Sequence, residues 1–179
     1  MSTLERSAIV AAIAAAVLAA CASQPPAPGR LPALGAAVSA DEIARWDISI
    51  PPSGAGLPAG SGTVKQGEAV YVAQCQACHG PKGVGKPADA LVGGIGSLAS
   101  GKPMRTVGSY WPYATTLFDY TRRAMPITKP LSLTNDEVYA VTAYVLYLNG
   151  IVGENAVMNA QTLPQVKMPN RDGFVRIGK

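Results

Sequence analysis

The amino-acid sequence predicts an all-α fold, and three observations support this prediction. Apolar side chains recur at helical spacing over residues 63–75 and again over residues 136–149. A third helix is expected over residues 112–123, because Pro112 in a first helical turn loses no backbone hydrogen bond. No alternation of apolar and polar residues is long enough to predict a strand.

Local signals mark the ends of these helices. Ser39 could cap a short helix over residues 41–46. The apolar positions of the first long helix are Val64, Gly67, Val70 and Tyr71. The last long helix begins with the capping-box pattern of Thr134 and Glu137 and stops at Gly150. Its apolar residues recur in steps of three and four, at Val138, Val141, Val145 and Leu148.

Length and composition limit the classes of protein to consider. The chain has 179 residues, which suffices for one small domain with tails but excludes a large α/β enzyme. Charged residues make up only 15%, which argues against a disordered chain. A net charge of +4 is too small and too scattered to indicate a nucleic-acid partner. Aromatic residues make up 6%, so the core is marginal and a buried apolar group would enlarge it.

The N-terminal residues predict export. Residues 8–20 are an uninterrupted run of Ala, Ile, Val and Leu, which suits a signal-peptide core and is short for a membrane span. The run ends at Cys21 and resembles a bacterial lipoprotein signal, with residues 1–20 removed and Cys21 lipidated. Plain secretion with cleavage after Ala22 is the alternative. Both interpretations place the mature chain in the periplasm, the first with a lipid anchor to a membrane.

The rest of the chain divides into three segments. Residues 21–60 are rich in Pro and Gly and are expected to form a linker or tether. Within it, residues 46–50 either dock on the folded part or belong to a free linker. Residues 61–150 contain all the Tyr residues and form the predicted compact domain. Residues 151–179 form a C-terminal extension that is either a docking strap for a partner or a disordered end. The basic residues of this extension include Lys167, Arg171, Arg176 and Lys179.

The motif Cys75-Gln76-Ala77-Cys78-His79 indicates the chemistry. C-x-x-C-H is the attachment signature of c-type haem, in which the thiols form thioethers and the His binds the iron. A redox-active C-x-x-C usually accompanies a βαβ pattern, a disulfide would not explain the adjacent His, and a zinc site needs four ligands. The motif therefore predicts one covalent haem c, attached at Cys75 and Cys78, with His79 as an axial iron ligand.

The second axial ligand must come from another residue type, because His79 is the only His in the chain. Met is the usual partner in electron-transfer cytochromes. We predict Met125, because Pro126 stiffens its loop and the last helix follows. The other candidates fit less well, two as gap-fillers of the core and one because it lies beyond the last helix: Met104, Met158 and Met168. An open sixth position is the remaining alternative.

The predicted compact domain resembles a class I cytochrome c. In that family a first helix runs into C-x-x-C-H, a Met-Pro loop supplies the distal ligand, and a last helix crosses the first. Gly67 and Tyr71 match the family's small and aromatic pair on the first helix, and Tyr144 and Tyr147 are the expected partners on the last. The resemblance also implies that a Pro carbonyl orients the His ring, for which Pro87 is the candidate.

Four further runs are distinctive: residues 105–115, 120–126, 135–144 and 167–174. They resemble the cytochrome c subunits of bacterial sulfite dehydrogenases and of the related Sox-type sulfane dehydrogenase. In those systems a molybdenum-cofactor subunit oxidises the sulfur compound and the haem subunit accepts electrons. The resemblance implies a monohaem electron-transfer protein that is not an enzyme by itself. Its donor would be the molybdenum sulfite or sulfur dehydrogenase subunit, and its acceptor a soluble cytochrome or terminal oxidase.

Two other functions remain open at this point. One is a generic periplasmic electron shuttle without a molybdenum partner, and the other is a gas sensor or peroxidase with an open sixth position. Trp111 and Tyr113 are expected either to flank the haem or to serve as ordinary core aromatics. Arg105, Arg122 and Arg123 either pair with haem propionates or belong to the solvated surface.

Overall fold

A computed structural model describes residues 35–175 and 178. The contacts divide the chain into two units, with the division after Trp46. The predicted signal segment, residues 1–20, and the predicted lipidation site, Cys21, lie outside the described residues. Within the described part, no helix has both the length and the apolar character needed to cross a membrane.

The first unit contains helix α2 (Ala40–Trp46), which confirms the short helix predicted there. The hydroxyl oxygen of Ser39 accepts a hydrogen bond of 3.2 Å from the Glu42 amide, as an N-cap residue does. Asp41 and Glu42 lie in the first turn and Arg45 in the last, so all three charges are favourable to the helix dipole.

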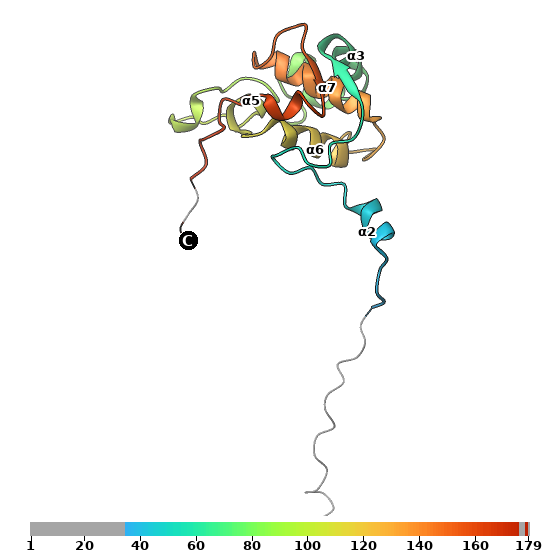
Figure 1. The fold of residues 1–179 in the computed structure, drawn as a ribbon. Helices are drawn as coiled ribbons and strands as arrows, with labels where there is room; N and C mark the ends of the chain where they lie inside the picture. Colours follow the sequence, from blue (N-terminus) through green and yellow to red (C-terminus); the bar gives the residue numbers. More distant parts are fainter. Residues whose placement is uncertain (1–34, 176–177, 179) are drawn as a thin grey trace, which may run out of the picture. The chain divides into compact units, whose positions relative to one another are not determined.

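The second unit combines helices with one small sheet, as Figure 1 shows. Its α-helices are α3 (Val64–Gln74), α4 (Gln76–His79), α5 (Val107–Tyr110), α6 (Ala114–Ala124) and α7 (Asn135–Leu148). Its strands are β1 (Ser61–Thr63) and β2 (Val157–Asn159), and its 3-10 helices are η1 (Pro81–Gly83), η2 (Ser97–Ala99) and η3 (Leu163–Gln165). The all-α prediction is confirmed, and the two short strands are an addition to it.

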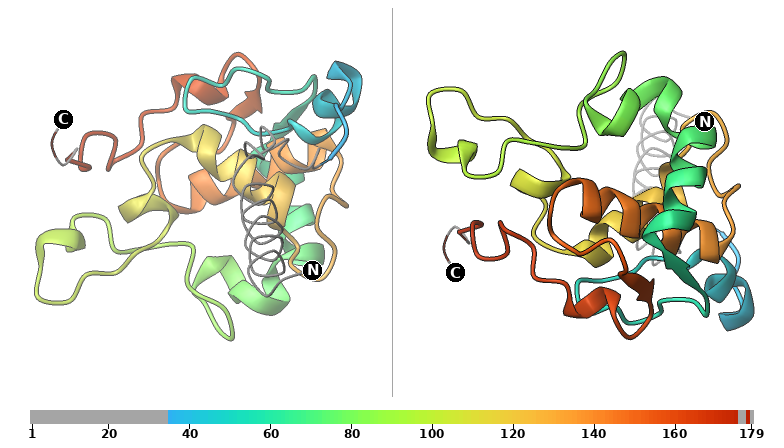
Figure 2. Two further views of the ribbon diagram at one scale, coloured as in Figure 1. Left: turned by 90° about the horizontal axis from the view of Figure 1, so that it is seen from below. Right: turned by 90° about the horizontal axis from the view of Figure 1, so that it is seen from above.

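Helices α3 and α7 form the central packing pair (Figures 1 and 2). Gly67 allows their close approach, because a Cβ at this position would overlap the carbonyl oxygen of Ala140. The Tyr71 ring lies 5.4 Å from the Tyr144 ring between centroids, which confirms one predicted partner. Tyr147, the other expected partner, instead has its ring 6.5 Å from that of Tyr144.

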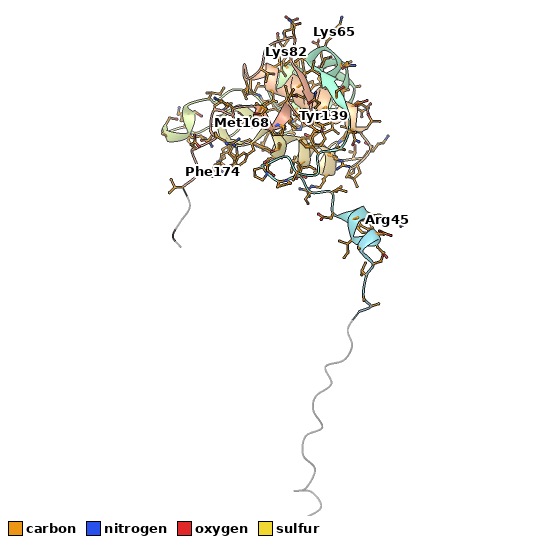
Figure 3. The ribbon with its side chains drawn as sticks, in the orientation of Figure 1. Arg45, Lys65, Lys82, Tyr139, Met168 and Phe174 are labelled. Atoms are coloured by element: carbon orange, nitrogen blue, oxygen red, sulfur yellow. The ribbon has the colours of Figure 1, made fainter. Side chains whose placement is uncertain are left out.

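Helix α6 packs on α7 through two aromatic rings. The Phe118 and Tyr139 ring centroids lie 4.4 Å apart, and both side chains are fully buried. Figure 3 shows Tyr139 within the body of this unit. The helix begins at Ala114 rather than at the predicted Pro112, because Tyr113 has extended backbone angles and acts as the N-cap.

The helix start signals operate as the sequence predicts. The Thr134 hydroxyl accepts from the Glu137 amide at 3.3 Å, and the Glu137 carboxylate accepts from the Thr134 amide at 2.8 Å. A second capping box, not predicted, joins Thr63 and Gln66 at the start of α3. Gly150 follows α7 with a φ of +68°, a conformation that favours glycine and ends the helix.

The two strands join distant parts of the sequence. They pair antiparallel with Gly62 opposite Met158, so the C-terminal extension is hydrogen-bonded to the start of α3. Met158 is buried, which confirms its predicted role as a core residue. A Cβ on Gly62 would overlap the backbone of Ala140, so the sheet lies directly against α7.

Part of the predicted linker packs on the helices. The side chain of Ile50 is buried in the hydrophobic core, and its amide donates to the Asp119 carboxylate on α6. The Tyr139 hydroxyl on α7 donates to the Pro58 carbonyl at 2.9 Å. Residues 47–60 are therefore held by side chains of two helices.

The C-terminal extension packs on the same unit as far as Phe174. Met168 is buried in the core, as Figure 3 also shows, and the Asn170 side-chain amide donates to the Tyr110 carbonyl at 2.7 Å. The Phe174 ring meets the Tyr110 ring edge-on with 5.2 Å between centroids. The last described residues extend to the same side as the loop before α5 (Figure 2). Arg176 lies outside the described residues.

Candidate functional site

The C-x-x-C-H motif forms a helical turn at the end of α3. Cys75 is at once the C-cap of α3 and the N-cap of α4, and its amide donates to the Tyr71 carbonyl at 2.9 Å. The Cys78 and His79 amides both donate to the Cys75 carbonyl, at 3.1 and 3.0 Å. This turn places the two thiols three residues apart on one helical turn, with His79 directly after them.

Neither described cysteine forms a disulfide. Cys75 is half-buried and Cys78 is exposed. Burial raises the pKa of the Cys75 thiol to about 11, and the neighbouring Cys78 adds to this increase. Cys75 is therefore a neutral thiol at neutral pH in this structure. The described part of the chain contains no cluster of three or more His, Cys, Asp or Glu side chains that could hold a metal ion, so the zinc interpretation gains no support.

The His79 ring is oriented by a backbone carbonyl. Its Nδ1 atom lies 2.8 Å from the carbonyl oxygen of Asp89, which can only accept, so Nδ1 carries the proton. No hydrogen bond among the described residues uses Nε2, which keeps its lone pair for another ligand. The prediction that the Pro87 carbonyl orients the ring is wrong, because the Asp89 carbonyl does so. The Ala88 amide donates to the Cys78 carbonyl at 2.8 Å, and this draws Asp89 to the ring.

The loop after His79 is folded back on the motif. The buried Tyr71 hydroxyl donates to the Gly80 carbonyl at 2.7 Å, and the Gly85 amide donates to the His79 carbonyl at the same distance. Burial, with a smaller effect of Cys75, raises the pKa of Tyr71 to about 12, so the hydroxyl remains a donor. Gly80 has a φ of +72°, and a Cβ there would overlap the Gly85 carbonyl oxygen.

Met125 is placed by α6. It is the C-cap residue of that helix, is half-buried, and its amide donates to the Thr121 carbonyl at 3.0 Å. Helices α3 and α6 both pack on α7. The segments that carry Cys75 and Met125 are therefore supported by the same helix.

The other Met residues occupy different environments. Met104 is 47% exposed, so the prediction that it fills a gap in the core is wrong. Its segment makes a turn in which the Met104 carbonyl accepts from the Ser109 hydroxyl at 2.5 Å, and the side chain stays at the surface. Met168 is only 3% exposed, and its side chain packs among the apolar residues of the core.

The two aromatic candidates contact other side chains of this chain. The Trp111 ring meets the Tyr120 ring edge-on with 5.6 Å between centroids. The Arg171 guanidinium lies 4.4 Å from the centroid of the Tyr113 ring, a cation–π arrangement. The haem-flanking role of Trp111 and Tyr113 stays a prediction.

The three Arg candidates make different contacts. Arg123 forms an ion pair with Asp119, and its Nε atom lies 3.0 Å from the carboxylate. Arg122 lies 3.5 Å from the Ile48 carbonyl. Arg105 lies 5.8 Å from the centroid of the Tyr110 ring. The Asp119–Arg123 pair was missed in the sequence, although Asp and Arg four residues apart on a helix are a recognisable signal.

Comparison with known proteins agrees with this geometry. The family model for subunit III of cbb3-type cytochrome c oxidase matches residues 62–145. A chain in the crystal structure of the sulfane dehydrogenase SoxCD from Paracoccus pantotrophus is 41% identical, with a TM-score of 0.75. That match covers 80% of this chain and 71% of the SoxCD chain. The chain belongs to the cytochrome c family. No curated protein matches this cytochrome significantly.

A cytochrome c is an electron-transfer protein that binds haem c, and the residues of this cytochrome fit that group. The motif offers two thiols and a His Nε2 that no described residue occupies with a hydrogen bond, and Met125 offers a thioether. A large apolar side chain follows each candidate ligand closely in the sequence and is exposed. Val84, after His79, is 61% exposed, and Ile127, after Met125, is 71% exposed. An apolar macrocycle is suited to surface of this kind.

Proposed function

We propose that this cytochrome is a monohaem protein that transfers single electrons. Cys75 and Cys78 would carry the thioether bonds of one haem c, and His79 and Met125 would be its axial ligands. When bound, haem c supplies an iron centre that changes between the ferrous and ferric states. The proposal is supported by the single C-x-x-C-H motif and by the orientation of the His79 ring.

The two axial side chains define what the protein does. A His and a Met together leave no position open to a substrate, so this chain would transfer electrons without being an enzyme by itself. A Met ligand also raises the reduction potential. The gas-sensor or peroxidase alternative would require an open position in place of Met125.

The electron donor in this proposal is the molybdenum-cofactor subunit of a sulfite or sulfur dehydrogenase. The observation that carries it is the 41% identity over 80% of the chain to a chain of sulfane dehydrogenase SoxCD. This match covers more of the chain than the haem domain of residues 61–150 alone. The electrons would pass on to a soluble cytochrome or a terminal oxidase.

The proposed location is the periplasm, with a lipid anchor at Cys21. The support is the apolar run of residues 8–20 followed by small residues and a Cys. Residues 21–46 would then link the anchor to the unit that begins at Asp47.

Purification of the native protein tests the proposed donor. We expect a molybdenum subunit to co-purify, and sulfite or a sulfane compound to reduce the haem of the complex, as followed by absorption. A cytochrome that purifies alone, and is not reduced when the molybdenum subunit of the same organism is added, would instead be a generic shuttle. Rapid, tight binding of carbon monoxide to the ferrous protein would contradict ligation by His and Met together.

A pair of variants tests the proposed attachment. Replacing both thiols, Cys75→Ala with Cys78→Ala, should abolish the haem that stays with the chain through denaturing electrophoresis. The matched control, Cys21→Ala, should retain that haem and lose only the lipid. Haem retained by the double variant would overturn the attachment.

A further inference from the structure

The carboxylate of Asp119 joins helix α6 to the segment that precedes β1. Asp119 is 7% exposed, and its Oδ1 atom accepts from the Ile50 amide at 2.8 Å and from Arg123 Nε at 3.0 Å. Ile50 is itself buried in the core. The carboxylate therefore satisfies the amide donor of a buried residue, and a buried donor left without a partner is costly.

Two further side chains of α6 hold the same segment. The Thr115 hydroxyl donates to the Pro52 carbonyl at 3.2 Å, and Arg122 lies 3.5 Å from the Ile48 carbonyl. Thr115 and Asp119 are four residues apart and so share one helical face. The neighbouring stripe of α6 consists of core residues, namely Ala114, Leu117 and Phe118.

Helix α6 is thus fixed on two sides, by the core on one and by residues 48–52 on the other. Met125 follows directly as its C-cap, with its amide bonded to the Thr121 carbonyl at 3.0 Å. Arg123, the ion-pair partner of Asp119, lies in the last turn. The network therefore ends in the turn that sets the position of the Met125 backbone.

We infer that Asp119 is a positioning residue for Met125, which it keeps within reach of the iron by clamping the last turn of α6 to the segment around Ile50. This inference rests on the proposed function, in which Met125 is an axial ligand. Without the carboxylate, Arg123 and the Ile50 amide lose their common partner. The last turn of α6 would then gain freedom, and Met125 would hold the iron of a bound haem less firmly.

The test uses the full-length protein with its covalent haem and imidazole as a probe ligand for ferric iron. Imidazole can bind only when the Met has left, so its affinity reports how often the bond opens. We expect Asp119→Ala to bind imidazole about tenfold more tightly than the wild type, within the range by which residues coupled through a network alter binding. In Asp119→Ala, the far-red charge-transfer band of Met ligation should weaken on heating at a temperature below the one at which the helices unfold.

Asp136→Ala is the matched control. Asp136 lies on α7, where its carboxylate accepts from the Ser61 amide in β1 at 2.7 Å, so it makes the same kind of bond to a backbone amide outside residues 48–52. This variant should keep the imidazole affinity and the band of the wild type. If Asp119→Ala yields no folded haem protein, the imidazole affinity and the far-red band are measured on Asp119→Asn instead.

The outcomes separate the inference from the proposed function. A folded Asp119 variant with lower thermal stability but wild-type imidazole affinity and band would overturn the positioning role and leave Met ligation intact. Equal loss in the Asp136 control would also overturn it, because the effect would then follow the loss of any carboxylate that binds a backbone amide before α3, not the clamp on α6. A wild-type protein without the band, with an affinity matching that of Met125→Ala, would contradict the proposed ligand itself.

Discussion

His79 donates its Nδ1 hydrogen to the carbonyl oxygen of Asp89 over 2.8 Å, so the backbone of one loop fixes the ring. A backbone carbonyl does not titrate, and the orientation of the ring is therefore independent of any neighbouring acid. The contact holds only while the loop keeps its own fold, which depends on hydrogen bonds back to the motif. The Tyr71 hydroxyl makes one of these, to the Gly80 carbonyl.

Replacing Tyr71 with Phe should destabilise the protein by about 1 kcal/mol, because a buried hydrogen bond of 2.7 Å to Gly80 is lost while the ring still packs. Chemical unfolding of the haem protein measures this. Tyr147→Phe is the control, since that side chain is 37% exposed and its loss of a hydroxyl should have little effect. Equal stability of Tyr71→Phe and the wild type would show that the hydroxyl contributes nothing to the loop.

The crossing of α3 and α7 should not tolerate a side chain at Gly67. A Cβ there would overlap the Ala140 carbonyl oxygen, so we expect Gly67→Ala to cost about 1–3 kcal/mol or more. This exceeds the gain of about 1 kcal/mol from the higher helix propensity of Ala. Gly153→Ala, where an added Cβ meets nothing within 4 Å, should change the thermal unfolding temperature little. A stable Gly67→Ala protein would contradict the observed closeness of the two helices.

The helices of this fold could be predicted because their signals are local. The capping box of Thr134 and Glu137 lies within one turn, and the predicted helix over residues 63–75 differs little from α3 (Val64–Gln74). The haem motif is also local, since its chemistry follows from three side chains in five residues. Such patterns need no knowledge of the tertiary structure.

The remaining features depend on contacts between distant residues. Gly62 pairs with Met158, but each strand has only three residues, too few for an alternation of apolar and polar side chains to predict this register. The carbonyl of Asp89 reaches the His79 ring only because the intervening loop bonds to the motif, whereas the family resemblance pointed to Pro87. The sequence left open whether residues 46–50 dock on the folded part or belong to a free linker, and the bond from the Ile50 amide to the Asp119 carboxylate shows that Ile50 docks. Composition predicts flexibility, but side chains elsewhere decide whether it is realised.

The two Met-Pro sequences should respond differently to removal of the thioether. Met125→Ala should lower the reduction potential and abolish the far-red band, because the half-buried Met125 is the proposed ligand. Met168→Ala should keep the band and potential. Its side chain is 3% exposed, so the cost should instead be about 2–5 kcal/mol of stability. Redox titration and absorption measure the first pair of quantities, and thermal unfolding measures the last.

Loss of the band in Met168→Ala, with retention in Met125→Ala, would reverse the assignment. Retention in both would indicate that neither sulfur is the ligand. A matched pair of Leu variants at the two positions keeps most of the side-chain volume, and so separates the loss of sulfur from the loss of packing.

The ion pair of Asp119 and Arg123 should make the free energy of unfolding depend on pH in the acidic range. Burial alone would raise the pKa of Asp119, but the hydrogen bonds from Arg123 and the Ile50 amide hold it below its ordinary value. The folded state therefore favours the ionised carboxylate, and its contribution to stability is complete above the unfolded pKa of about 3.9 and is lost as the pH falls through the lower folded value. We expect the free energy of unfolding of Asp119→Asn to fall less steeply than that of the wild type below about pH 4, so that the two curves converge in acid.

The control is Thr115→Val, which removes a hydrogen bond to the same segment without removing a titrating group. Its loss of unfolding free energy relative to the wild type should therefore be the same at every pH. Unfolding by urea across this range measures all three proteins, and a wild-type slope in Asp119→Asn would show that this carboxylate does not govern the acid sensitivity.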